Sequence, residues 1–153
     1  MEGMVIKSFN PPYDSFNDRR ILITGHSGFQ GAWLTRWLQL LGANICGISL
    51  EGNVTEPDLY SLLRIESKIQ EHRADINDIN STLHIVHNFK PDLIIHLAGQ
   101  SLVFRGFEDP LNTFRTNVLG TICVLEAVKS SSDIKGVVIA TSDKCYSNDE
   151  SGN

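Results

Sequence analysis

A hydroxyl, a carboxylate and an amine follow one another at the end of an apolar run. The run covers residues 137–141, and Ser142, Asp143 and Lys144 come directly after it. Such side chains could orient a substrate, donate a proton and remove one. A Ser-Asp turn followed by a solvated lysine has the same residues and is common at strand ends. Spacing alone favours the turn, whereas a position over the same sheet edge as a cofactor would favour the chemistry.

Three glycines near the start of the chain indicate where such a cofactor would lie. Gly25, Gly28 and Gly31 follow the apolar run 21–23 and precede the helical pattern 32–38. Gly25 permits a tight turn, Gly28 lets backbone N–H groups approach a pyrophosphate, and Gly31 lets the helix pack on the strand. The phosphates would then lie at the positive end of a helix.

An acidic residue at the end of the next strand completes the pattern. Glu51 follows the run 44–50 and comes twenty residues after Gly31. A carboxylate at this place accepts hydrogen bonds from a ribose and repels a 2′-phosphate, which predicts NAD rather than NADP. The alternative is a tight turn in another kind of α/β protein, with Glu51 a solvated loop residue.

Apolar runs and turn residues predict alternating strands and helices. Strands are expected over 21–24, 44–50, a short stretch ending near 73–74, 93–97 and 137–141, and helices over 30–41, 58–66, 78–88 and 110–130. The late strands are continuous apolar runs, which indicates burial on both faces of a parallel sheet. The predicted fold is α/β, a Rossmann-type doubly wound parallel sheet truncated after strand five. An irregular lead-in over 1–19 would precede an NAD-binding domain over 20–153.

Composition excludes several classes of function. The net charge is −5 without a basic cluster, which argues against nucleic acid, and no apolar run is long enough to span a membrane. Three separated cysteines and no leader pattern favour the cytoplasm. No metal site is expected, because His84 and His87 lack a third ligand at suitable spacing. His96 is interpreted as a core histidine, and Trp33 and Trp37 as packing residues.

Longer segments resemble the extended short-chain dehydrogenase/reductase family of nucleotide-sugar enzymes, the NAD-dependent epimerases and dehydratases. Within that family the sequence is most similar to the 4,6-dehydratases that act on CDP-glucose. The likeness is carried by residues 24–31 with Trp33 and Trp37, and by 89–92, 96–100, 116–121 and 141–146.

The resemblance implies a cofactor site. Phe29 and Gln30 would lie under the pyrophosphate, and Glu51 would hold the adenosine ribose. Asp75 and Ile76 match the pair that contacts adenine in the family. The residues expected to line the nicotinamide side are Leu97, Ala98, Gly99, Gln100, Ser101 and Thr116.

The resemblance also implies a lyase reaction on a nucleotide-sugar substrate. Hydride leaves C4 of the hexose for NAD and returns to C6 after water is lost across C5 and C6. Ser142 would hydrogen-bond the C4 oxygen, Asp143 would protonate the leaving C6 hydroxyl, and Lys144 stands where related enzymes carry the C5 base. A lysine base needs a pKa well below that of a free amine.

One family feature is missing from these residues. The Tyr-x-x-x-Lys pair that oxidises C4 does not occur, because Asn17, Arg64 and Glu150 stand four residues after the three tyrosines. We therefore expect the cofactor half of a dehydratase, without its sugar-nucleotide domain and inactive alone. A non-catalytic NAD-binding or partner-binding module stays open, as does an epimerase or reductase of the same family.

Two sequence features predict association. Leu111, Phe114, Val118 and Leu125 form an apolar face on the expected helix 110–130, which is either core or a dimer interface. A sheet that stops at strand five also has an open edge. We expect a homo-oligomer or pairing with a missing C-terminal half.

Overall fold

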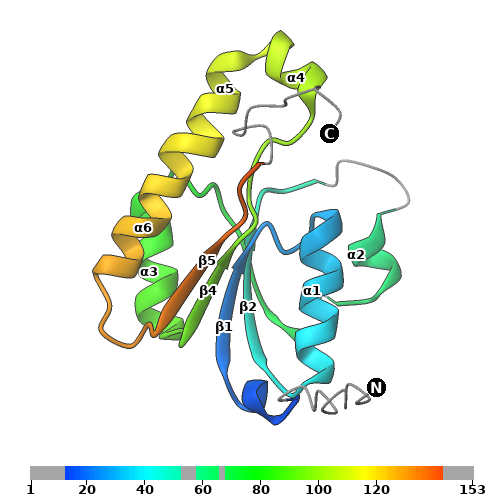
Figure 1. Ribbon diagram of the computed structural model, residues 1–153, viewed down its shortest axis with the longest axis vertical. Coiled ribbons are helices and arrows are strands. Elements are labelled where there is room, and N and C mark those ends of the chain that lie inside the picture. The colour runs from blue at the N-terminus through cyan, green and yellow to red at the C-terminus, as the bar shows by residue number, and fades with distance from the viewer. Residues whose placement is uncertain (1–12, 53–57, 66–67, 143–153) are drawn as a thin grey trace, which may run out of the picture.

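The computed structural model describes residues 13–52, 58–65 and 68–142. Its centre is a parallel sheet in which the strand order is β3-β2-β1-β4-β5 (Figure 1). The strands are β1 (Arg20–Thr24), β2 (Asn44–Ser49), β3 (Gln70–Arg73), β4 (Leu93–His96) and β5 (Gly136–Ile139). The predicted Rossmann-type sheet is therefore confirmed over the described residues.

Helices cover both faces of the sheet. The first group is α1 (Phe29–Leu40) and α2 (Leu59–Leu62), and the second is α3 (Ile79–Phe89) and α6 (Thr121–Lys129) on the opposite face (Figure 1). A 3₁₀ turn, Tyr13–Phe16, precedes β1. No helix in these described stretches is long and apolar enough to cross a bilayer.

The chain reverses its direction of winding at β1, which pairs with β2 on one side and β4 on the other. In register, Thr24 of β1 lies beside Ile48 and His96, so the carboxyl ends of the three strands meet at one edge. Ligands of open α/β sheets bind beyond this edge, at the point where the strand order reverses. The fold thus places the glycine turn and the residues after β2 and β4 around one region.

The expected helix 110–130 is interrupted by a wider turn. It consists of α5 (Pro110–Phe114), a π-helical segment (Arg115–Gly120) and α6. A Cβ at Gly120 would overlap the Ile76 side chain closely, so glycine lets this helix approach the core. The preceding α4 (Val103–Glu108) was not predicted, and Figure 1 shows α4 and α5 rising beyond the carboxyl edge.

Two expectations about packing were wrong. Trp33 and Trp37 are 54% and 57% exposed, because α1 buries its other side through Ala32, Thr35 and Leu38. Strand β5 is only partly buried, and Val138 is 53% exposed. Among the described strands β5 lies at an edge of the sheet, so its apolar sequence does not give burial on both faces.

The helix expected over 58–66 is shorter in the structure, where α2 covers only Leu59–Leu62.

The apolar face predicted on helix 110–130 is not part of the core. Leu111 and Phe114 are 79% and 68% exposed, and Val118 and Leu125 are 46% and 40% exposed. The core contacts of α6 come instead from Val124 and Ala127, which lie on its other side.

Candidate functional site

The glycine turn after β1 packs closely against the end of β2 and the residues that follow β4. Gly25 has φ +73°, and its N–H donates to the carbonyl of Ile48 on β2 (2.7 Å). A Cβ on Gly25 would lie 2.7 Å from the backbone nitrogen of Ala98. The positive φ and this contact both require glycine.

The start of α1 is compact on its inner side and open on its outer side. A Cβ on Gly31 would overlap the carbonyl oxygen of Gly25, which in turn accepts from the N–H of Gly28 (3.1 Å). Gly28 caps α1 without a side-chain hydrogen bond, and Gly28, Phe29 and Gln30 are exposed. First-turn N–H groups without a capping side chain suit an anion such as a pyrophosphate.

Residues expected to hold adenosine follow β2 and β3. Glu51 is exposed and comes two residues after the end of β2. Asp75 is also exposed, and its Oδ1 accepts from the backbone N–H and the side-chain amide of Asn77 (2.9 and 2.8 Å). Ile76 is 5% exposed and packs in the core. Its side chain is therefore part of the core, and contact with adenine would fall to its backbone.

A buried histidine for which the sequence predicts no role lies beneath the glycine turn. His26 is fully buried, and Gly47 of β2 leaves the space for its ring, because a Cβ there would overlap the imidazole. Its Nδ1 lies 3.2 Å from Ser49 Oγ, and its Nε2 lies 3.1 Å from Glu71 Oε1. A glycine inside an apolar strand was the one signal in the sequence.

The partners assign the tautomer of His26. Ser49 Oγ already accepts from Ser27 Oγ (2.9 Å) and from Arg73 Nη1 (3.4 Å), so its own hydrogen is directed to Nδ1. Nε2 therefore carries the ring proton and donates to Glu71. Burial lowers the pKa of His26 below its ordinary 6.5, and the hydrogen bond with Glu71 opposes that shift.

A second buried histidine joins β4 to β1 and to the helix above. His96 is 2% exposed; its Nδ1 lies 2.6 Å from Thr24 Oγ1, and its Nε2 lies 3.0 Å from Thr121 Oγ1. Thr24 Oγ1 accepts from the N–H of Ala98 (3.2 Å), and Thr121 Oγ1 donates to the carbonyl of Asn117 (2.8 Å). Thr24 must therefore donate to Nδ1, and Nε2–H to Thr121. The interpretation of His96 as a satisfied core histidine is confirmed, and burial lowers its pKa.

This hydrogen-bonded chain supports the loop expected beside the nicotinamide. Asn117 Oδ1 accepts from the backbone N–H of Gln100 (2.7 Å), and Asn117 Nδ2 donates to its carbonyl (3.0 Å). The Gln100 amide donates to Thr113 (2.9 Å) and accepts from the N–H of Leu102 (2.7 Å). Gln100 therefore braces the loop against the segment that carries Thr113 and Asn117.

The other expected nicotinamide residues lie along the same loop. Gly99 and Ser101 are exposed, Leu97 and Ala98 are half-buried, and Thr116 lies half-buried in the π-helical segment. The loop and this segment are joined through Gln100 and Asn117, so the fold brings the predicted residues to one side of the carboxyl edge.

Only the first member of the expected catalytic trio can be placed. Ser142 is exposed and comes three residues after the end of β5, while Asp143 and Lys144 lie outside the described residues. The N–H of Ala140 donates to the carbonyl of His96 (3.0 Å), which joins the ends of β4 and β5. Ser142 therefore follows a strand end on the same edge as the glycine turn.

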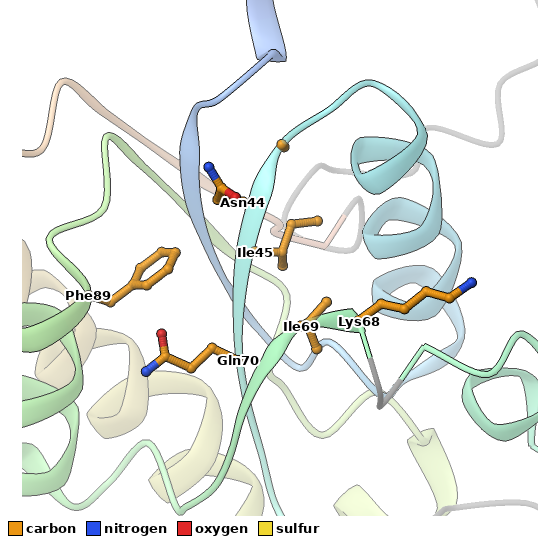
Figure 2. Close-up of a pocket in the computed structure, with 7 residues that line it drawn as sticks. Asn44, Ile45, Lys68, Ile69, Gln70 and Phe89 are labelled. Carbon is orange, nitrogen blue, oxygen red and sulfur yellow. The ribbon is translucent and has the colours of Figure 1, made fainter.

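A depression marks the opposite edge of the sheet. It is lined by Ala43, Asn44, Ile45, Lys68, Ile69, Gln70 and Phe89, around the amino ends of β2 and β3. Figure 2 shows Phe89 on one side of β2, with Lys68 and Ile69 on the other. Ligand sites of open α/β sheets lie at the carboxyl ends, so this depression is not the predicted site. His84 and His87 are exposed on α3, and the described stretches hold no group of three side chains suited to a metal ion.

Comparison with known proteins shows which family has this turn and this sheet. The family model for GDP-mannose 4,6 dehydratase matches residues 22–152. The chain belongs to this family. The resemblance to nucleotide-sugar epimerases and dehydratases is thereby confirmed.

Two curated relatives are similar to most of the chain. A CDP-glucose 4,6-dehydratase from Salmonella typhimurium is 42% identical over 132 residues, which are 86% of this chain and 36% of the relative. A UDP-glucose 4-epimerase from Mycolicibacterium smegmatis is 32% identical over 83% of this chain and 40% of its own. The chain thus spans well under half the length of these relatives.

Solved structures agree on the fold. A UDP-glucose-4-epimerase from Stenotrophomonas maltophila, with bound NAD and formylated UDP-arabinopyranose, superposes with a TM-score of 0.75. It is 23% identical, and the match covers 86% of this chain and 39% of that one. At this identity the match establishes a shared architecture.

Proposed function

We propose that this chain carries the NAD-binding part of a nucleotide-sugar 4,6-dehydratase that converts CDP-glucose to CDP-4-keto-6-deoxyglucose. The observation that carries the proposal is the 42% identity to a CDP-glucose 4,6-dehydratase along 86% of the chain. The open glycine turn at the strand-order reversal supports the cofactor-binding part independently, because no side chain caps the N–H groups at the start of α1.

The proposed cofactor site extends along the carboxyl edge. The pyrophosphate would lie against Gly28, Phe29 and Gln30, whose outer surfaces are exposed. Glu51 would accept hydrogen bonds from the adenosine ribose. At the other end, the braced loop 97–101 and Thr116 would face the nicotinamide. NAD would supply hydride acceptance at C4 of the sugar and hydride return at C6.

The residues after β5 would handle the protons of the reaction. Ser142 would donate a hydrogen bond to the C4 oxygen, Asp143 would protonate the departing C6 hydroxyl, and Lys144 would remove the C5 proton. No tyrosine in the 153 residues has a lysine four positions on. We therefore expect this chain alone to bind the cofactor without turning over CDP-glucose.

The cofactor proposal is tested by equilibrium dialysis with NAD⁺ and NADP⁺. We expect saturable NAD⁺ binding that weakens about tenfold in Glu51→Ala, the effect of losing charged hydrogen bonds to the ribose. Glu126→Ala removes a carboxylate that is 51% exposed on α6, and it should bind NAD⁺ like the wild type. Absence of NAD⁺ binding by the wild type would overturn the proposal. Turnover of CDP-glucose by this chain alone would overturn the expectation that it binds the cofactor without catalysing the reaction.

A second candidate function is a non-catalytic module that associates through its apolar surfaces. Leu111 and Phe114 on α5 are strongly exposed, and Phe104 and Phe107 on α4 are 72% and 83% exposed. Exposed patches of this kind mark association sites. Light scattering should therefore detect oligomers, and the double variant Leu111→Glu with Phe114→Glu should form fewer of them. A wild-type protein that stays monomeric at all concentrations would contradict this candidate.

A further inference from the structure

The end of β3 carries an ion pair for which the proposed function has no role. Glu71 and Arg73 lie two residues apart on β3, so their side chains leave the same face of the sheet. Arg73 Nη2 is ion-paired with Glu71 Oε1 at hydrogen-bonding distance. The Glu71 side chain is 20% exposed and that of Arg73 is 28% exposed, so both are partly shielded from water.

Arg73 is also attached to the end of β2. Its Nη1 donates to the carbonyl of Leu50 (3.1 Å) and to Ser49 Oγ (3.4 Å). Its guanidinium carbon lies 5.6 Å from the ring centroid of Tyr60. Leu50 directly precedes Glu51, so the guanidinium is held where the proposed ribose carboxylate leaves the strand.

A guanidinium at this place has a chemical consequence. Arginine binds phosphate through two parallel N–H donors, a fixed geometry that lysine lacks. An arginine at the adenosine ribose would therefore attract the 2′-phosphate of NADP. Here one terminal nitrogen of Arg73 is engaged by Glu71 and the other by Leu50, and the adjacent carboxylate neutralises its charge.

Resting on the proposed cofactor function, we infer that Glu71 is a specificity-determining residue for the cofactor. Glu71 holds Arg73 against the end of β2 and so withholds the guanidinium from a 2′-phosphate. Discrimination against NADP then depends on two carboxylates: Glu51 repels the phosphate directly, and Glu71 occupies the group that would bind it. Removal of the charge of Glu71 should release a latent 2′-phosphate site on Arg73.

The choice of variant follows from the second contact of Glu71. Its Oε1 also accepts from His26 Nε2 (3.1 Å). Glu71→Gln keeps a carbonyl oxygen for His26 and removes the charge that holds Arg73. Arg73→Met keeps the aliphatic length and removes the guanidinium, and the double variant Glu71→Gln with Arg73→Met separates the two effects.

The experiment measures binding of 2′-AMP, 5′-AMP, NAD⁺ and NADP⁺ to these variants by equilibrium dialysis. In Glu71→Gln we expect the affinity for 2′-AMP relative to 5′-AMP, and for NADP⁺ relative to NAD⁺, to rise about tenfold, as for one charged hydrogen bond. The rise should vanish in the double variant and shrink at high salt. Glu126→Gln, which breaks the exposed pair with Lys129 on α6, should leave both ratios unchanged.

Two outcomes separate this inference from the proposed function. Unchanged ratios in Glu71→Gln, with wild-type binding of NAD⁺ intact and a wild-type circular dichroism spectrum, would overturn the inference and leave the cofactor function. If the wild type binds no NAD⁺, the cofactor function falls. The inferred release of Arg73 then stands only if Glu71→Gln gains 2′-AMP binding that the double variant lacks.

Discussion

The two sides of the strand-order reversal each bury a histidine, and they surround it with different chemistry. On the β2–β3 side, His26 lies between a serine hydroxyl and Glu71, whose carboxylate also pairs with Arg73. On the β4–β5 side, His96 lies between the hydroxyls of two threonines. The charged network lies under the proposed ribose end, and the neutral one lies under the proposed nicotinamide end.

The difference suggests a division of work along one edge. Charges that attract or repel a phosphate are useful where adenosine would bind. The loop proposed to face the nicotinamide is better supported by hydroxyls and amides, because their hydrogen bonds change little when the charge of a nearby ring changes. Both histidines are neutral donors and acceptors in fixed tautomers, and each one joins side chains from neighbouring elements. The first three predictions below test how the two differ, and the fourth concerns the two faces of α1.

The largest effect is expected from a methyl group added beside His26. Gly47→Ala would force its Cβ into the imidazole, and overpacking of this kind costs about 3 kcal/mol of unfolding free energy. Gly136→Ala on β5 is the matched control, because its Cβ would lie 3.5 Å from Leu93 Cδ1, an ordinary contact. Urea denaturation measures both. The clash is not the cause if His26→Ala fails to relieve the cost of Gly47→Ala.

Removal of the His96 imidazole should lower the unfolding free energy by a somewhat smaller amount. His96→Leu leaves the buried hydroxyls of Thr24 and Thr121 without their shared partner, a loss of about 2 kcal/mol. His84→Leu on the exposed face of α3 is the control and should change stability by less than about 0.5 kcal/mol. Equal values for the two variants would show that the His96 chain contributes nothing to stability.

The two histidines should also differ, by a smaller amount, in how much stability each one loses for the protein at acidic pH. Burial lowers the pKa of both below 6.5, so the unfolded chain binds protons more readily as the pH falls. Stability is full above the pKa of an unfolded histidine and declines as the pH falls through 6.5 toward the lowered folded pKa. The carboxylate of Glu71 favours protonated His26, so His96→Gln should remove more of this decline than His26→Gln in denaturation measured at pH 7.5 and 5.5. The reverse order would contradict the charged-versus-neutral comparison.

The smallest effect is expected on the outer face of α1. Trp33→Ala removes a large side chain that is 54% exposed, and it should cost less than about 1 kcal/mol of unfolding free energy. Leu38→Ala on the inner face, where Leu38 is 3% exposed, should cost about 3 kcal/mol. A large cost for Trp33→Ala at low protein concentration would contradict the observed exposure.

Features that depend on neighbouring residues could be predicted from the sequence. The order of strands and helices, the glycine turn and its position before α1 follow from hydrophobic periodicity and from the steric freedom of glycine, which are local properties. The position of Glu51 after β2 and the role of His96 as a bonded core residue were also predicted. Ser142 could be placed at a strand end because parallel strands bring their carboxyl ends to one edge.

Tertiary structure decided the partners of the buried polar groups and the outward direction of the tryptophans. His26 meets Glu71 across 45 positions of sequence, and His96 meets Thr24 across 72 and Thr121 across 25. A buried polar group must find a hydrogen-bond partner, but its own sequence neighbours do not say which one. The strand register brings these side chains together, and for His26 the space left by Gly47 is also needed. Both conditions depend on segments that are far apart in the sequence, so local patterns cannot predict them.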